Sequence, residues 1–295
     1  MGHGVENLRG SLLMVLAMAG FAIEDMCVKF LAGHMPVGEV LMLLGLGGTA
    51  IFATLALRNG DRLMSRDLLA PAVIARNFGE LIGTLAFVCA VAFTPLAQAS
   101  AILQATPLAV TLGAALFLGE QVGWRRWTAI GVGFAGVLIV IRPGTEGFSV
   151  LSLFAVVGVL GLAARDVVTR RVPKSITSMQ LATYGFASVI PAGALLIPFQ
   201  GPVQMPTAFD LGSIAAALIF GTAGYYALIA AMRLGEVAVI TPFRYTRLIF
   251  ALIIGWAVFA ENPDRWTLIG GAIIVASGLY TLARQRRRAT AEPAT

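Results

Sequence analysis

Ten long apolar runs, separated by short connections, are the feature that most constrains how this chain can fold. A helix needs about 20 apolar residues to cross about 30 Å of hydrocarbon. With 58% hydrophobic and 12% charged residues, the chain has more apolar surface than a water-soluble domain can bury. Strand-like alternation is absent from the runs, which excludes a membrane barrel. We therefore expect an all-α integral membrane protein with ten transmembrane helices, at about residues 10–32, 37–57, 69–92, 95–118, 125–142, 149–166, 178–199, 210–232, 236–260 and 265–283.

The distribution of basic residues predicts how these helices are oriented, because cytoplasmic connections are enriched in Lys and Arg. With the N-terminus inside, only Arg142 and Arg265 fall in external connections. The cytoplasmic segments then hold Arg9, Arg58, Arg62, Arg66, Arg125, Arg126, Arg165, Arg170, Arg171, Lys174, Arg233, Arg284, Arg286, Arg287 and Arg288. We expect both termini to be cytoplasmic. The net charge of +6 follows from this orientation, so no nucleic-acid partner is expected.

A short motif occurs twice in the chain, each time between two apolar runs. Phe117-Leu118-Gly119-Glu120 precedes Trp127-Thr128-Ala129-Ile130-Gly131, and Phe259-Ala260-Glu261 precedes Trp266-Thr267-Leu268-Ile269-Gly270. Each copy joins the fourth and fifth spans of a five-span half, and chance repetition is the alternative explanation. Because five is odd, Glu120 and Glu261 are expected on opposite faces of the membrane. We predict two inverted five-helix repeats, residues 1–143 and 144–295, an architecture typical of alternating-access transporters.

Further motifs carry a resemblance to a known family over essentially the whole chain. They are Asp25 to Lys29, Pro36 and Glu39, Arg76, the stretch from Pro95-Leu96-Ala97-Gln98-Ala99 through Pro107 to Gly119-Glu120, Arg170 and Arg171, and Thr241 to Leu248. In order and spacing they resemble the drug/metabolite transporter superfamily, specifically its EamA-type ten-helix carriers. In size and plan the chain is most similar to amino-acid exporters of the YddG type. The resemblance implies a secondary carrier that exports amino acids, including aromatic ones, or else imports a vitamin or nucleotide-type metabolite such as riboflavin or S-adenosylmethionine.

Charged residues within the first and third spans are candidates for function, because an ionisable group at membrane depth is costly unless it is paired or faces water. Asp25 and Lys29 are four residues apart and can pair on one helical face. Glu24 has no basic partner at helical spacing in its own span, so it is either a proton-coupling carboxylate or the partner of a distant arginine. Arg76 and Glu80 share a face, where they either pair or line a cavity.

The ninth span provides two arginines one turn apart, Arg244 and Arg247, with Tyr245 beside them and no acidic neighbour in the helix. Two guanidinium groups can hold a carboxylate or phosphate, although pairing with Glu24 or Glu80 is the alternative. The spans contain one more positive charge than negative, which a bound carboxylate would balance. The predicted substrate-binding residues are Arg76, Glu80, Gln98, Gln104, Tyr225, Arg244, Tyr245 and Arg247.

Two prolines, Pro107 and Pro242, occupy the fourth and ninth spans and are expected to bend these helices during transport. An enzyme is not expected, because the only histidines are His3 and His34 and no catalytic cluster exists. We also expect no cofactor and no metal site. A channel is a remote alternative. The expected partners are a small-molecule substrate and the lipid bilayer, a monomer suffices for this plan, and the Arg-rich composition favours a bacterial inner membrane.

Overall fold

The computed structural model describes residues 2–289, except for residues 65, 147, 174, 201 and 235–236. Within these residues every regular element is a helix. The first half contains α1 (Gly2–His34), α2 (Val37–Arg58), η1 (Arg66–Leu69), α3 (Pro71–Phe93), α4 (Leu96–Leu103), α5 (Thr106–Phe117) and α6 (Trp124–Ile141). The second half contains α7 (Ser152–Thr169), α8 (Ser178–Gln200), α9 (Ala208–Leu234), α10 (Val237–Ile240), η2 (Thr241–Tyr245), α11 (Thr246–Phe259) and α12 (Arg265–Ala289).

The number of membrane spans and their approximate positions agree with the apolar runs. Ten helical segments among the described residues are long and apolar enough to cross a bilayer. The fourth of these spans combines α4 and α5, and the ninth runs from Thr241 to Phe259 through η2 and α11. The all-α, ten-span fold class is therefore confirmed.

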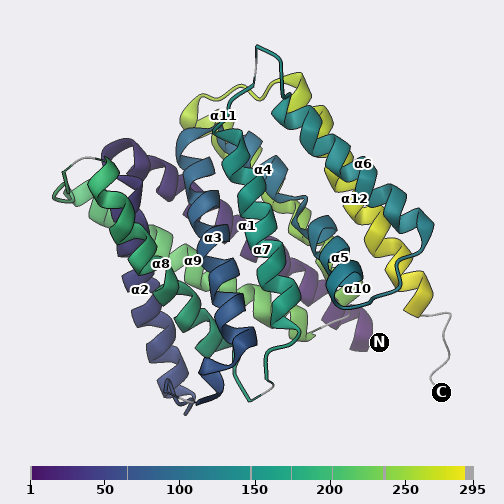
Figure 1. The fold of residues 1–295 in the computed structure, drawn as a ribbon, viewed down its shortest axis with the longest axis horizontal. Helices are drawn as coiled ribbons and strands as arrows, with labels where there is room; N and C mark the ends of the chain where they lie inside the picture. The colour runs from purple at the N-terminus through teal and green to yellow at the C-terminus, as the bar shows by residue number, and fades with distance from the viewer. Residues whose placement is uncertain are drawn as a thin grey trace.

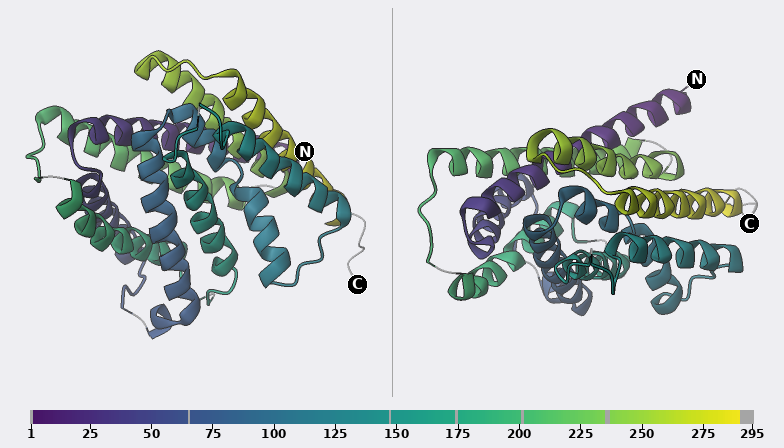
Figure 2. Two further views of the ribbon diagram at one scale, coloured as in Figure 1. Left: turned by 45° about the horizontal axis from the view of Figure 1, so that its top comes forward. Right: turned by 90° about the horizontal axis from the view of Figure 1, so that it is seen from above.

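The long helices associate in four close pairs, and each pair joins one helix from each half: α1 with α9, α2 with α8, α3 with α7, and α6 with α12. Figure 2 shows the α6–α12 pair side by side at one edge of the bundle. The α1–α9 pair joins the first helix of the first half to the third spanning helix of the second half. The α3–α7 pair joins the third spanning helix of the first half to the first helix of the second half. An inverted repeat would produce this arrangement, and the repeat itself stays a prediction.

Glycines allow the α1–α9 and α3–α7 pairs to approach closely. A Cβ atom added at Gly20 of α1 would lie 2.8 Å from the carbonyl oxygen of Phe220, and one added at Gly79 of α3 would lie 3.1 Å from that of Gly161. Backbone contact of this kind is how membrane helices gain van der Waals energy, because lipid provides little hydrophobic drive for helix association.

The helix pair α6–α12 is antiparallel, which places the two copies of the repeated motif at opposite ends of the bundle. Trp266 at the start of α12 lies beside Arg142 at the end of α6, whereas Arg284 lies beside Trp124 at the start of α6. Glu120 directly precedes α6 and Glu261 directly precedes α12, so these two carboxylates also lie at opposite ends (Figure 1).

The fourth and ninth spans are interrupted where the sequence places prolines. The fourth breaks at Gln104, just before Pro107 in the first turn of α5, and the ninth contains the 3₁₀ segment η2 with Pro242. Proline has no amide hydrogen to donate and its ring clashes with the preceding turn, which favours such a break, although α8 runs on through Pro191 and Pro198. The Gln104 side-chain amide joins the two breaks, donating to the carbonyl oxygens of Arg244 (3.4 Å) and Tyr245 (3.1 Å).

Candidate functional site

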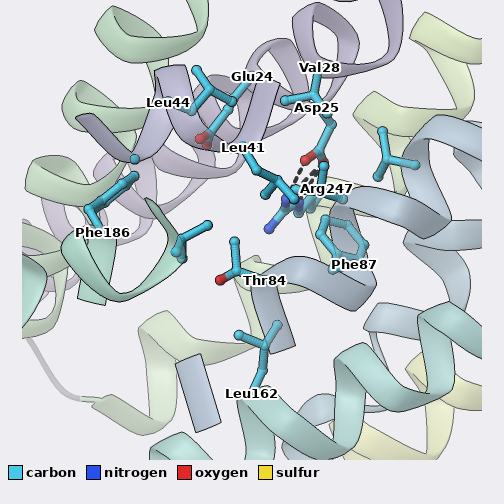
Figure 3. A pocket seen from close by; sticks show the side chains of 14 residues that line it. Glu24, Asp25, Val28, Leu41, Leu44, Thr84, Phe87, Leu162, Phe186 and Arg247 are labelled. Carbon is cyan, nitrogen blue, oxygen red and sulfur yellow. Dashed lines mark hydrogen bonds and ion pairs between the residues drawn. The ribbon is translucent and has the colours of Figure 1, made fainter. Parts of the chain in front are cut away.

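A cavity of about 270 Å³ lies between the two halves, next to the breaks in the fourth and ninth spans. The charged and polar side chains that line it are Glu24, Arg76, Glu80, Thr84, Gln104, Thr106, Arg165, Tyr225, Arg244, Tyr245 and Arg247. A second, more apolar chamber of about 120 Å³ adjoins it and shares Glu24, Thr84 and Arg247 with it. Figure 3 shows this smaller chamber, with the Asp25 and Arg247 side chains joined across it.

Arg247 is held by Asp25 of α1 in a forked ion pair. Its Nη2 donates to both carboxylate oxygens at 2.8 Å, and its Nε donates to Oδ2 at 3.1 Å. The guanidinium also lies 5.3 Å from the ring centres of Phe21 and Phe87. Two-point hydrogen bonding fixes both the position and the orientation of the arginine. Arg247 therefore forms part of the cavity wall, with its Nε and Nη2 engaged by Asp25.

The expected pairing of Asp25 with Lys29 is wrong. Lys29 instead pairs with Glu261 in the connection between α11 and α12, with Nζ 2.6 Å from Oε1, and it also donates to the Thr94 carbonyl oxygen at 2.7 Å. Tertiary packing provides each residue with a partner from another element, and the planar guanidinium of Arg247 matches the two oxygens of Asp25 in geometry, which the ammonium of lysine does not.

Glu80 of α3 lies between two arginines. The expected pair with Arg76 is present at 2.7 Å, and Arg165 of α7 pairs with the other carboxylate oxygen at 3.0 Å. Arg165 also pairs with its neighbour Asp166 at 2.8 Å. The assignment of Arg165 to a cytoplasmic segment is therefore wrong, because α7 continues to Thr169 and turns this arginine into the cavity.

Two charged side chains on the cavity wall make no hydrogen bond or ion pair with any described residue: Glu24 and Arg244. The Glu24 carboxylate packs against Gly221 of α9, where an added Cβ would lie 2.8 Å from Oε1. Arg244 belongs to η2, whose backbone is tied to Gln104. Both face the same cavity, so this cavity offers one unpaired carboxylate and one unpaired guanidinium.

Including Arg165 changes the balance of charge around the cavity. Four arginines, Arg76, Arg165, Arg244 and Arg247, are accompanied by four carboxylates, Glu24, Asp25, Glu80 and Asp166. The excess positive charge that the sequence predicted is therefore absent from this part of the described structure.

Of the four remaining predicted substrate-binding residues, three line the cavity and one does not. Tyr225 lines the cavity and packs edge-on against Phe52, with ring centres 5.1 Å apart. Tyr245 also lines it, but its buried hydroxyl reaches Gly278 of α12 and has no hydrogen-bond partner among the described residues. Gln98 lies outside both chambers and donates to the Val140 carbonyl oxygen at 3.3 Å. Gln104 lines the cavity, with its amide nitrogen already engaged.

A signal in the sequence could have located Arg165. Glu120 and Glu261 are 141 positions apart, and the same separation relates Asp25 to Asp166 and Glu24 to Arg165. Aligning the two halves on the repeated glutamate would have placed Arg165 at the position equivalent to Glu24, inside a span and facing the centre.

The chain belongs to the EamA-like transporter family, whose model matches residues 8–142 and again residues 150–283. It is therefore a multi-pass membrane transporter of the drug/metabolite type. A solved crystal structure shares the fold with a TM-score of 0.63, covering 96% of this chain and 99% of the other at 20% identity.

Three curated relatives span nearly the whole chain. A riboflavin transporter of Rhizobium johnstonii is 26% identical, covering 95% of this chain and 92% of that protein. An S-adenosylmethionine uptake transporter of Rickettsia bellii is 25% identical, covering 92% and 93%. The pseudopaline exporter CntI of Pseudomonas aeruginosa is 28% identical, covering 91% and 94%. These names include both uptake and export, and none of the three is an amino-acid exporter by name.

Proposed function

We propose that this transporter carries a zwitterionic metabolite, with amino acids as the leading candidates, by alternating access and without ATP hydrolysis. The observation that supports this substrate class is the presence of one unpaired carboxylate, Glu24, and one unpaired guanidinium, Arg244, on the wall of the same cavity. In this proposal Arg244 binds the substrate carboxylate and Glu24 accepts the substrate ammonium group.

The cost of unpaired charge at membrane depth favours a ligand with both charges. An ion removed from bulk water without a partner is costly, and a ligand that carries the opposite charge relieves that cost. A purely anionic ligand would leave Glu24 to be neutralised by a proton alone, and an uncharged ligand would also leave Arg244 unpaired. Glu80 is already neutralised by Arg76 and Arg165, so the substrate need not break those pairs.

Glu24 has a second role in the proposal, as the proton carrier. When the cavity is empty, a proton on Glu24 removes the same unpaired charge that a substrate ammonium group would neutralise. Exchange of proton for substrate would couple the two, and export driven by an inward proton gradient is the direction we propose. Pro107 and Pro242 are the bending points of the fourth and ninth helices in this cycle.

Uptake of a vitamin or nucleotide-type metabolite is the second candidate, because two of the relatives are named for riboflavin and S-adenosylmethionine. The two compounds differ in a useful way. S-adenosylmethionine contains an amino-acid group, with both an ammonium and a carboxylate, whereas riboflavin has neither. A comparison of the two therefore tests the zwitterion rule whichever direction transport takes.

The test is uptake by purified protein in liposomes, using labelled phenylalanine, leucine, S-adenosylmethionine and riboflavin, with and without a pH gradient. We expect saturable uptake and counterflow of the zwitterions. Arg244→Gln should raise their KM roughly 10- to 100-fold, the effect of losing a hydrogen bond to a charged group. Glu24→Gln should abolish the response to the pH gradient. Arg142→Gln, outside the cavity, is the matched control. Transport of riboflavin alone, or an unchanged KM in Arg244→Gln, would overturn the proposal.

A further inference from the structure

Two ion pairs at opposite ends of the bundle occupy matching places in the two halves. At one end Lys29, near the end of α1, pairs with Glu261, which precedes α12. At the other end Arg170, which caps the end of α7, pairs with Glu120, which precedes α6. Lys29 and Arg170 are 141 positions apart, and so are Glu120 and Glu261.

Each pair joins the first helix of one half to the last connection of the other half. Because the acid and the base come from different halves in both cases, each pair links the two halves across the bundle. A relative movement of the halves that separates them at one end must break the pair at that end.

The backbone of the broken fourth span is held beside both pairs. At the Glu261 end, Oε2 of Glu261 accepts a hydrogen bond from the amide of Leu96, the first residue of α4, at 2.8 Å. Lys29 donates there to the carbonyl oxygen of Thr94, two residues earlier, at 2.7 Å. At the Glu120 end this contact comes from the residue next to the pair: Arg171 donates to the carbonyl oxygen of Phe117, the last residue of α5, at 2.6 Å. One end of the fourth span is thus bonded by the Lys29–Glu261 pair itself, and the other end by the residue that follows Arg170.

The two pairs differ in their contact with solvent. The side chains of Lys29 and Glu261 are 15% and 16% exposed, whereas those of Arg170 and Glu120 are 45% and 39% exposed. A buried pair resists separation more than an exposed one, because water screens and replaces the exposed interaction. The structure is therefore more firmly closed at the Glu261 end.

We propose that these pairs are the latches of two opposite gates, and that transport alternates between breaking Lys29–Glu261 and breaking Arg170–Glu120. This inference rests on the proposed alternating-access function and names the residues that gate it. Release of Glu261 frees the start of α4, and release of Glu120 frees the segment after α5. Gln104 links the break in the fourth span to the backbone of Arg244, so movement of this span reaches the substrate site.

The experiment measures access to the cavity from each side and requires no substrate. Thr84, which lines both chambers, is replaced by cysteine, and a membrane-impermeant maleimide is applied to either face of reconstituted protein. Glu261→Gln should increase labelling from the face near residue 261 roughly fivefold, which corresponds to about 1 kcal/mol in the gate equilibrium. Glu120→Gln should increase labelling from the opposite face. Exchanging the charges, Lys29→Glu with Glu261→Lys, restores the ion pair but not the bonds to Leu96 and Thr94, so it should lower the labelling below that of Glu261→Gln without reaching the wild-type value.

Asp264→Asn is the control, because it removes the neighbouring Arg142–Asp264 pair, whose side chains form no hydrogen bond or ion pair with the fourth span among the described residues. Size-exclusion profiles report folding, and Lys29→Gln replaces Glu261→Gln if that variant aggregates. Unchanged labelling, or an equal change in labelling from both faces, would overturn the proposal that these ion pairs hold the two gates closed. Side-specific labelling combined with no transport of a zwitterion would overturn the proposed substrate and leave the latches standing.

Discussion

The Asp25–Arg247 pair makes a quantitative prediction about stability. Asp25→Asn keeps the shape of the side chain and removes its charge, leaving the Arg247 guanidinium between Phe21 and Phe87 without a counter-ion. The two side chains are 7% and 17% exposed, so water replaces the lost carboxylate poorly. Removing one partner of a buried pair costs about 3–5 kcal/mol. At roughly 2–4 °C per kcal/mol, we expect the Tm to fall by about 10 °C.

The assay is thermal unfolding in detergent, followed by intrinsic tryptophan fluorescence, with Asp264→Asn as the matched control. Asp264 pairs with Arg142, and the Asp264 side chain is 43% exposed, so loss of this ion pair should cost about 1 kcal/mol or less. Adding Arg247→Met to Asp25→Asn removes both charges and should recover most of the stability. The reasoning fails if Asp25→Asn is no less stable than the control, or if the double variant is as unstable as the single one.

Two other predictions concern α12 and the connection before it. Gly278→Ala places a methyl group against the Tyr245 hydroxyl, which should cost about 1–3 kcal/mol of stability. Tyr245→Phe alone should be nearly neutral and should rescue the alanine variant in part in thermal unfolding, because the ring carbon Cζ would still lie 2.6 Å from the added Cβ; no rescue at all would contradict this packing. Burial raises the pKa of Asp264, but hydrogen bonds from the Thr267 amide and the nearby Arg142 charge outweigh burial and hold the pKa below its ordinary value. The contribution of the ionised Asp264 carboxylate to the stability of the fold is therefore present above its unfolded-state pKa, and it is lost as the pH falls through its folded-state pKa. Wild type and Asp264→Asn should differ in Tm at neutral pH and converge in acid, and a pH-independent difference would be contrary evidence.

The sequence could predict the elements of this fold better than the contacts between them. Apolar runs locate spans because hydrocarbon thickness sets their length, and Pro107 and Pro242 indicate the breaks because proline cannot continue the helical hydrogen bonds. Helical periodicity, however, pairs residues only within one helix. It offered the Arg76–Glu80 pair as one of two alternatives, and in the structure these residues both pair and line the cavity.

Contacts across the bundle depend on how the halves pack, which periodicity does not contain. Asp25 and Lys29 share a helical face, yet each finds its partner on another element, Arg247 and Glu261. Arg165 was misplaced because a basic residue near the end of an apolar run is indistinguishable from a cytoplasmic flank. Residue 165 falls at the end of the predicted run 149–166, whereas α7 continues to Thr169 and Arg165 lines the cavity.

The opposite orientation of the two halves is the claim on which the cavity, the latches and the transport cycle depend. Single cysteines at Gln121 and Asn262, beside Glu120 and Glu261, report that orientation directly when intact cells and inside-out vesicles are treated with an impermeant maleimide. We expect Gln121→Cys to react only in inside-out vesicles and Asn262→Cys only in intact cells. Reaction of both from the same side would contradict the account.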